Sequence, residues 1–226
     1  METAILSLGM AFIIGLVHFF GEEIDERTSV SSLFFASFSA GFTIAYFFLA
    51  LLPEISTVSV QGLEFVFVLA GFSFFYIVEE LIYERSSHIT EIKKEFKELH
   101  TLFITGYHFC IGIILLFLLN QDLTQALLFF VPVLVHTAVN SLAIREMHEE
   151  ILDNLGLKVL ASFSTVLGVG FAHLFGVPSD ISFALLGVIG GMFVYLVIHD
   201  SLDPQKERPL GFFLGVLAFG LLLALL

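Results

Sequence analysis

The sequence predicts an all-α integral membrane protein, a bundle of eight spanning helices with both termini outside. Three observations predict this class. Hydrophobic residues make up 58% of the 226 positions and charged residues only 14%, with a mean hydropathy of +0.98, so lipid rather than water must solvate most of the chain. The apolar residues fall into eight stretches of about 20 residues, the length that a spanning helix needs. The basic residues all lie on alternate connections between these stretches.

Each predicted helix is an apolar stretch bounded by polar or charged residues. In order along the chain, the spans cover residues 3–20, 31–52, 63–83, 101–119, 123–144, 158–175, 181–199 and 210–226. We expect one transmembrane domain, residues 1–226, because such short connections leave no room for a separate soluble module. The longest connection, residues 84–100, is rich in helix formers and polar on every side. This pattern predicts either a solvated cytoplasmic helix or a loop.

The distribution of positive charge predicts the orientation in the membrane. Lys and Arg occur only on the first, third, fifth and seventh connections: Arg27, Arg85, Lys93, Lys94, Lys97, Arg145, Lys158, Lys206 and Arg208. By the positive-inside rule these connections face the cytoplasm and both termini lie outside. No sorting signal is recognised, so we expect a plasma or inner membrane. The net charge of -13 excludes nucleic acid as a partner; the lipid bilayer and, in a homodimer, a second copy of the chain are the expected partners.

Glycines indicate where the helices pack closely. Two spans near the C-terminus carry glycines with the small-xxx-small spacing of tight helix contacts: Gly187 with Gly191, and Gly211 with Gly215. A second pattern relates two spans that are predicted to run in opposite directions. Gly41 precedes Tyr46 by five residues, and Gly190 precedes Tyr195 by the same number, which is the echo expected from an inverted repeat.

Polar groups within the apolar spans are the candidates for function. His136 and Asn140 lie one helical turn apart near the middle of the fifth span. Pro132, one turn earlier, cannot donate a backbone hydrogen bond and frees a carbonyl nearby. Because polar side chains at mid-membrane are costly and mark substrate paths, this combination predicts a polar cavity at half the membrane thickness.

Other histidines lie at successive depths. His173 is near the outer end of the sixth span, His108 in the inner half of the fourth, and His18 and His199 at the inner ends of the first and seventh. Neutral imidazole favours zinc, copper, iron or nickel. Acidic residues suited to a departing cation would surround the cytoplasmic end of this series: Glu22, Glu23, Glu79, Glu80 and Asp200.

Purely structural roles are alternatives for several of these residues. His18 and His199 are also typical interfacial anchors, with an apolar body and a polar tip. His108 also fits a polar contact between helices. The single Cys110 excludes an intramolecular disulfide, and its thiol is either a packing group or a soft metal ligand.

Several stretches resemble the ZIP (Zrt/Irt-like) family of divalent metal transporters. Leu51, Leu52, Pro53 and Glu54 are similar to the Leu-Leu-Pro-Glu that ends the family's second helix. LAGFSFFYIVEELI in the third span resembles its Gly-Phe stretch ending in a glutamate. LLGVIGGMFVYLVIHDSL in the seventh is similar to its glycine-containing stretch with an acidic end, here Asp200. The resemblance covers nearly the whole chain and implies the ZIP fold with an inverted repeat.

The resemblance also implies a metal site between the fourth and fifth helices. His136 and His108 fit the histidines of the two family motifs, whereas the acids of the fifth-helix motif fall on Thr137 and Asn140, and no acid follows His108. Imidazole, amide and hydroxyl groups provide lone pairs without charge, so a dication would bind less well than in a carboxylate site. A Cys110 thiolate or carboxylates from another helix could compensate.

Three functions follow as alternatives. The first is a ZIP-like carrier, with no enzymatic activity and no resident cofactor, that moves zinc or iron toward the cytoplasm. The second is a transport-inactive ZIP relative with a structural or regulatory role, which the missing acids favour. The third is an intramembrane zinc hydrolase, which the spread of the histidines in depth disfavours, because ligands of one ion must lie within ~2 Å of it. The residues expected to meet the metal are His136, Asn140, His108, Thr137, Cys110, His173, His199 and Asp200, with His173 the first that the ion meets.

Overall fold

The structure, a computed structural model, describes residues 2–21, 29–57, 63–85, 89–143, 155–201 and 208–226. In these ranges all regular structure is helical and no strand occurs, as predicted. The helices are α1 (Glu2–Gly21), α2 (Ser29–Tyr46), α3 (Leu52–Thr57), α4 (Glu64–Arg85), α5 (Ile89–Gln121), α6 (Leu123–Ala143), α8 (Leu155–Phe175), α9 (Ser179–Ser201) and α10 (Pro209–Leu225). A π-helical turn, Phe47–Leu51, joins α2 to α3, so that these three segments form one rod.

Each predicted span coincides with one of these rods. Four helical segments are long and apolar enough to cross a membrane: Glu2–Phe20, Leu33–Thr57, Lys158–Phe175 and Ser179–His199. Four shorter apolar segments complete the set in the described residues: Phe65–Val78, Thr105–Gln121, Leu123–Val139 and Pro209–Leu225. Large apolar side chains also cover the outside of the bundle, for example Leu69, Leu174 and Leu221. Such a surface requires lipid around it, which is consistent with a helical membrane protein.

Most of the connection predicted at residues 84–100 is helical in the structure. Helix α5 begins at Ile89 and continues without interruption through the fourth predicted span to Gln121, over 33 residues. Of the two alternatives for this segment, helix is therefore the observed one over residues 89–100, and the helix extends beyond the predicted span at its N-terminal end. The sequence explains this helix, because residues 89–100 are mostly Lys, Glu and Leu, which are good helix formers, and include no Gly or Pro that would end the helix.

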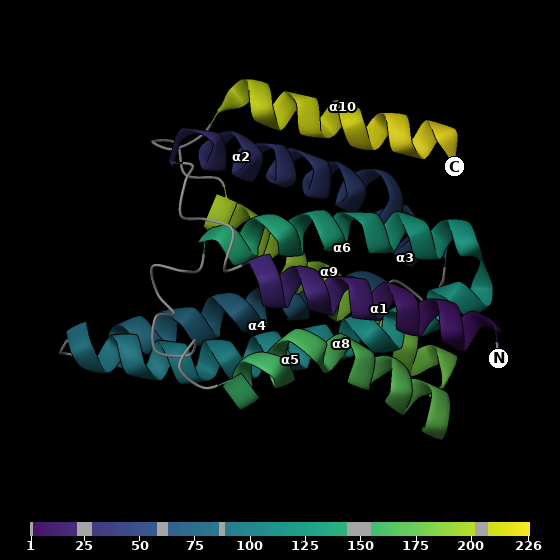
Figure 1. Ribbon diagram of the computed structural model, residues 1–226, viewed down its shortest axis with the longest axis horizontal. Coiled ribbons are helices and arrows are strands. Elements are labelled where there is room, and N and C mark those ends of the chain that lie inside the picture. Colours follow the sequence, from purple (N-terminus) through teal and green to yellow (C-terminus); the bar gives the residue numbers. More distant parts are fainter. Residues whose placement is uncertain (1, 22–28, 58–62, 86–88, 144–154, 202–207) are drawn as a thin grey trace.

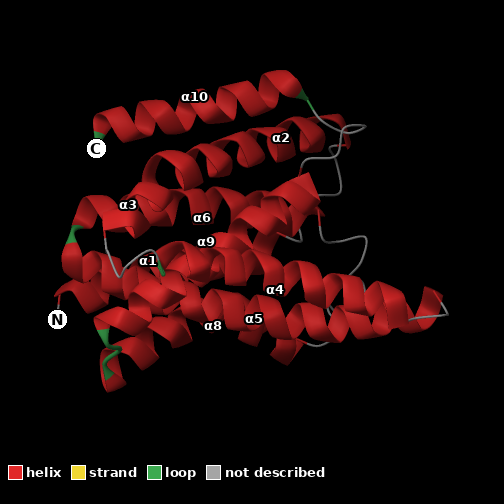
Figure 2. Ribbon diagram, turned by 180° about the vertical axis from the view of Figure 1, so that it is seen from behind, coloured by secondary structure: helices red, strands yellow, loops and turns green. Residues whose placement is uncertain are grey.

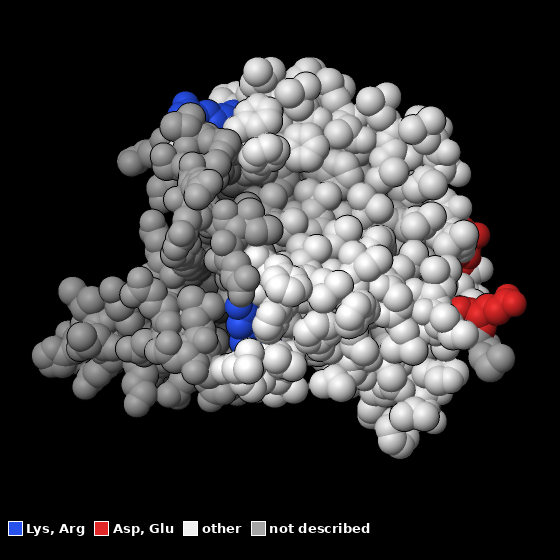
Figure 3. Space-filling view, viewed as in Figure 1, with Lys and Arg blue, Asp and Glu red and all other residues white. Residues whose placement is uncertain are grey.

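The rods lie side by side, and both termini lie at the same end of the bundle (Figure 1). Helices α2 and α10 form one edge, α4, α5 and α8 form the opposite one, and α6, α9 and α1 lie between them, as the reverse view also shows (Figure 2). On the face that Figure 3 shows, the visible Lys and Arg side chains lie toward the left and the visible Asp and Glu side chains at the right edge, with uncharged surface between them.

Helix α5 is the centre of the core. Every residue from Ile111 to Leu119 is buried, and α5 packs against α1, α4, α6, α8 and α9. By contrast α10 is peripheral and buries only one large side chain, Phe219. Its first turn is held on α2 because the backbone N–H of Arg208 donates to the Ser37 hydroxyl at 2.9 Å.

Three helix pairs are held together by the same reciprocal glycine contact. In each pair, a Cβ added to the glycine of one helix would collide with the backbone carbonyl oxygen of a residue on the other, and the reverse is also true. The contacts are Gly41 with Phe212 and Gly215 with Phe38 (α2–α10), Gly71 with Val188 and Gly191 with Val68 (α4–α9), and Gly112 with Thr165 and Gly168 with Phe109 (α5–α8). In each helix, the residue whose carbonyl oxygen is contacted lies three positions before that helix's own glycine. Only glycine permits such an approach of two backbones.

The glycine pattern of the sequence predicted part of this packing. Gly191, Gly211 and Gly215 make close contacts as expected. The predicted equivalence of Gly41 and Gly190 is off by one residue. The glycine of α9 that contacts a neighbouring backbone is Gly191, whereas Gly190 faces the side chain of Leu51.

We predict that Gly168→Ala destabilises the protein by about 1–3 kcal/mol, the usual effect of overpacking a well-packed contact. The added methyl group would collide with the carbonyl oxygen of Phe109. Gly170→Ala, two residues further along α8, is the matched control, because nothing lies within 4 Å of its added Cβ. Unfolding in mixed detergent micelles measures both. Equal stability of the two variants would show that the α5–α8 contact is not tight.

Candidate functional site

Two of the predicted site histidines, together with His18, form a cluster inside the bundle. His108 on α5 and His136 on α6 are both buried. The ring of His18 on α1 lies edge-on to that of His108, with 5.2 Å between the centroids. His108 is close enough to both His18 and His136 to interact with each electrostatically. Three helices therefore bring three imidazoles into one region, including the pair that was predicted between the fourth and fifth spans.

Helix α8 provides hydroxyl partners for two of these rings. The Nδ1 of His108 is hydrogen-bonded to Thr165 Oγ1 at 3.3 Å, and the Nδ1 of His18 to Ser162 Oγ at 3.1 Å. Both hydroxyl residues are buried. A hydrogen bond at Nδ1 fixes the orientation of the ring, and in the tautomer whose Nδ1–H donates to the hydroxyl the lone pair lies on Nε2.

The close approach of α8 to α5 makes this arrangement geometrically feasible. Thr165 is itself one of the residues whose carbonyl oxygen meets a glycine, Gly112, across the helix pair. With the two backbones in contact, even the short side chain of Thr165 reaches His108. His18 was also open to interpretation as an interfacial anchor, whereas in the structure it belongs to the cluster.

The other predicted site residues lie elsewhere or outside the description. Cys110 is half-buried and free, but it is two residues after His108, and residues at that spacing do not share a helix face. His173 is exposed near the end of α8. His199 is exposed on α9, where its ring stacks on Tyr195 at 5.7 Å. Neither ring contributes to the cluster.

Thr137, next to His136, is buried. Asn140 and Asp200 lie in α6 and α9, and their side chains are outside the part of the chain that the structure describes. Among the described side chains, no group of three or more His, Cys, Asp or Glu residues is placed to hold a metal ion. The histidine cluster in this conformation is therefore an open arrangement rather than a closed coordination sphere.

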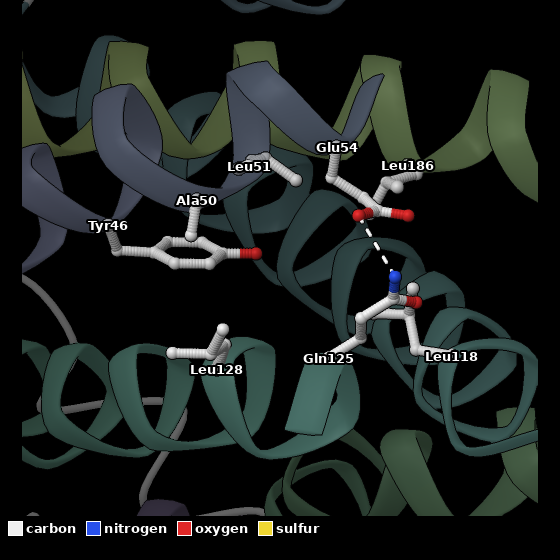
Figure 4. Close-up of a pocket in the computed structure, with 8 residues that line it drawn as sticks. All are labelled: Tyr46, Ala50, Leu51, Glu54, Leu118, Gln125, Leu128 and Leu186. Carbon is white, nitrogen blue, oxygen red and sulfur yellow. Dashed lines mark hydrogen bonds between the residues drawn. The ribbon is translucent and has the colours of Figure 1, made fainter. Parts of the chain in front are cut away.

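A second polar location lies near the end of the bundle that carries the termini. There, a cavity of about 30 Å³ is lined by Tyr46, Ala50, Leu51, Glu54, Leu118, Gln125, Leu128 and Leu186. Gln125 Nε2 donates a hydrogen bond to Glu54 Oε2 at 3.1 Å, and the Tyr46 hydroxyl is directed toward this pair (Figure 4). We call this space the outer cavity, after the orientation that the positive-inside rule predicts. Glu54 appeared in the sequence only as part of a family motif, and Gln125 carried no signal.

Local backbone features place the polar residues of the outer cavity. Two α-helical turns take about 7.2 residues, so Tyr46 and Glu54, eight positions apart, would not align on a regular helix. The π-helical turn between them takes up the additional residue. At the start of α6, the Asp122 carboxylate accepts hydrogen bonds from the backbone N–H groups of Thr124 and Gln125. This N-cap fixes the turn that presents Gln125.

Phe193 of α9 contacts one residue of the outer cavity and one residue of the histidine cluster. Its buried ring contacts Tyr46 on one side, with centroids 6.4 Å apart, and His136 on the other, at 4.7 Å. Both contacts are edge-on, the geometry that aromatic pairs prefer. The two polar locations are thus joined through one apolar ring.

We predict that the buried bond between His108 and Thr165 contributes a coupling free energy of about 0.5–1.5 kcal/mol to unfolding. A double-mutant cycle of His108→Ala and Thr165→Val in mixed micelles measures it. Ser164→Ala is the control partner, because the Ser164 hydroxyl donates to the backbone oxygen of Ala161 instead. A coupling with Ser164 as large as that with Thr165 would mean that the cycle reports general repacking.

Comparison with known proteins identifies no relative. No protein-family model matches the chain, and no curated protein matches it. The functional conclusions therefore depend on the residues of this chain and their geometry.

Proposed function

We propose that this protein is a ZIP-like membrane carrier that moves a divalent metal ion, zinc or iron(II), toward the cytoplasm. The observation that carries the proposal is the position of three imidazoles on three helices: the rings of His18 and His108 lie edge-on to each other, and His136 is buried on α6, which packs against both α1 and α5. Buried polar clusters at membrane depth are expensive and mark substrate paths. Neutral imidazole nitrogens suit zinc and iron better than they suit magnesium or calcium.

The polar groups form two stations along the long axis of the bundle. Gln125 and His136 both belong to α6 and are eleven positions apart, which corresponds to roughly 16 Å at 1.5 Å per residue. The first station is the outer cavity and the second is the histidine cluster. An ion that passes from one to the other must displace the ring of Phe193, so this residue is the proposed barrier to free diffusion.

The open arrangement of the cluster fits a carrier that gathers its ligands during the transport cycle. Two of the rings are hydrogen-bonded to hydroxyl groups, and no group of three ligands is in position among the described side chains. The ion would therefore be bound only after the helices move relative to one another, as in the rocking of transporter bundles. The same reciprocal glycine contact in α2–α10 and α4–α9 supports the inverted repeat that such carriers often contain.

Two alternatives are weighed against the carrier. A zinc hydrolase needs three protein ligands around one ion and an open position for water, and the described part of the chain brings no such set together. A transport-inactive relative is favoured by the same observation and by Thr137, which stands where the resemblance to the ZIP family implies an acid. Flux measurements separate this relative from the carrier.

We predict that His136→Ala and His108→Ala each reduce zinc and iron(II) uptake into proteoliposomes by tenfold or more, in line with the loss of about 1.4 kcal/mol or more of ligand interaction. His173→Ala is expected to leave the maximal rate unchanged because its exposed ring lies outside the cluster. A higher half-saturating concentration in that variant would support His173 as the first residue that the ion meets. Wild-type vesicles that take up no metal would favour the inactive relative.

The direction of transport depends on the orientation of the bundle. In a Cys110→Ser background, a cysteine appended after Leu226 is expected to react with a membrane-impermeant maleimide in intact cells. A cysteine at position 158 should react only after permeabilisation, because basic helix ends face the cytoplasm. The reverse pattern would show that the outer cavity faces inward and that import is the wrong direction.

A further inference from the structure

We infer that the outer cavity is a cation-binding site of its own, with oxygen ligands from Glu54, Gln125 and Tyr46, and that it takes a hydrated divalent ion. This inference rests on the proposed function for the ion's onward route, but the binding itself can be tested without transport. The site differs in chemistry from the histidine cluster, since it offers carboxylate, amide and phenol oxygens, the donors that hard cations prefer.

The first argument is charge. Glu54 is half-buried in a cavity whose other walls are mainly Ala50, Leu51, Leu118, Leu128 and Leu186. None of the eight lining residues is Lys, Arg or His. A carboxylate in apolar surroundings is costly unless it is paired, and the amide of Gln125 provides a hydrogen bond but no positive charge. A bound cation would compensate this charge.

The second argument is an unused acceptor. Gln125 directs its Nε2 at Glu54, and its Oε1 atom is buried without a hydrogen-bond partner among the residues that the structure describes. Buried acceptors of this kind are rare, because each loses its bonds to water. The carboxylate of Glu54 and the hydroxyl of Tyr46 face the same space, and Gln125 lines it from α6 with its oxygen on the side of the amide away from Tyr46 (Figure 4). The three residues thus place three oxygen atoms along the walls of one pocket.

The third argument is size and position. The space of about 30 Å³ is more than a single water molecule needs, so it accommodates a divalent ion that keeps some of its water. The cavity lies at the end of the bundle that holds α3 and the termini (Figure 1), ahead of Phe193 on the way to the histidines. An ion collected here would keep part of its hydration shell and exchange it for imidazole only beyond that ring.

The competing explanation is a purely structural one, in which the Glu54–Gln125 bond fastens α3 to α6. Glu54→Gln separates the two roles. A glutamine at this position still offers an oxygen acceptor to Gln125 Nε2, so the fastening is retained, but the negative charge is lost. Asp180→Asn is the matched control, because it removes one carboxylate from the exposed first turn of α9 without touching the cavity.

The test is titration of the purified full-length protein in nanodiscs with Mn²⁺ alone, with free Mn²⁺ followed by electron paramagnetic resonance. We expect the wild-type protein and Asp180→Asn to bind Mn²⁺ equally, and Glu54→Gln to bind it roughly tenfold more weakly or not at all, because ligand charge sets the affinity of oxygen sites. Glu54→Gln binding as tightly as the wild type, or a wild-type protein that binds no Mn²⁺, would overturn the inference.

Failure of this site and failure of the proposed function give different results. If Mn²⁺ binding depends on Glu54 but wild-type vesicles take up no metal, the outer site stands and the carrier proposal fails. If vesicles take up metal in a His136-dependent way while Glu54→Gln binds Mn²⁺ as the wild type does, the carrier stands and the outer site is refuted.

Discussion

The close approach of helix backbones at glycine is the constraint on which the rest of this structure depends. In lipid there is no hydrophobic force to drive one apolar helix against another, so the helices must gain their stability from tight van der Waals contact. In α2–α10, α4–α9 and α5–α8 a glycine of each helix lies against a carbonyl oxygen of the other. At those points no side chain holds the two backbones apart.

This packing also determines where polar chemistry can occur. Because α8 lies against α5 at Gly112 and Gly168, the hydroxyl of Thr165 reaches the ring of the buried His108. On the α1 side, Gly15 lies against the backbone of Ser162, whose hydroxyl is hydrogen-bonded to His18. Burying polar groups in an apolar bundle is tolerable only where such partners exist, so the position of the histidine cluster follows from the position of the glycines.

The two polar stations differ in what they offer to an ion. The outer cavity has oxygen donors and one negative charge, whereas the cluster has neutral nitrogen donors surrounded by hydroxyl groups. The ring of Phe193 between them contacts a residue of each. An ion would therefore meet hard ligands while it is still hydrated and softer ones only after most water has been removed, which is a favourable order for zinc or iron(II).

The sequence by itself determined the class of the protein and the location of its helices. Apolar length and the bounding polar residues are local properties, so they identify all eight rods, and the spacing of Gly211 and Gly215 indicated a close contact. His136 and His108 were also identifiable, because a polar residue within an apolar helix is conspicuous. The start of α5 at Ile89 was less certain, since a polar segment of helix formers fits both alternatives.

Only the tertiary structure decided which polar groups meet. Local sequence gives the depth of a side chain but not the rotation of its helix relative to the others. His18 was therefore open to interpretation as an anchor until the packing of α1 brought its ring against that of His108. The outer cavity depends on a π-helical turn that aligns Glu54 with Tyr46 and on the packing of α6 that brings Gln125 opposite. Such alignments are fixed by contacts between segments far apart in the chain, and these contacts exist only after the helices have packed.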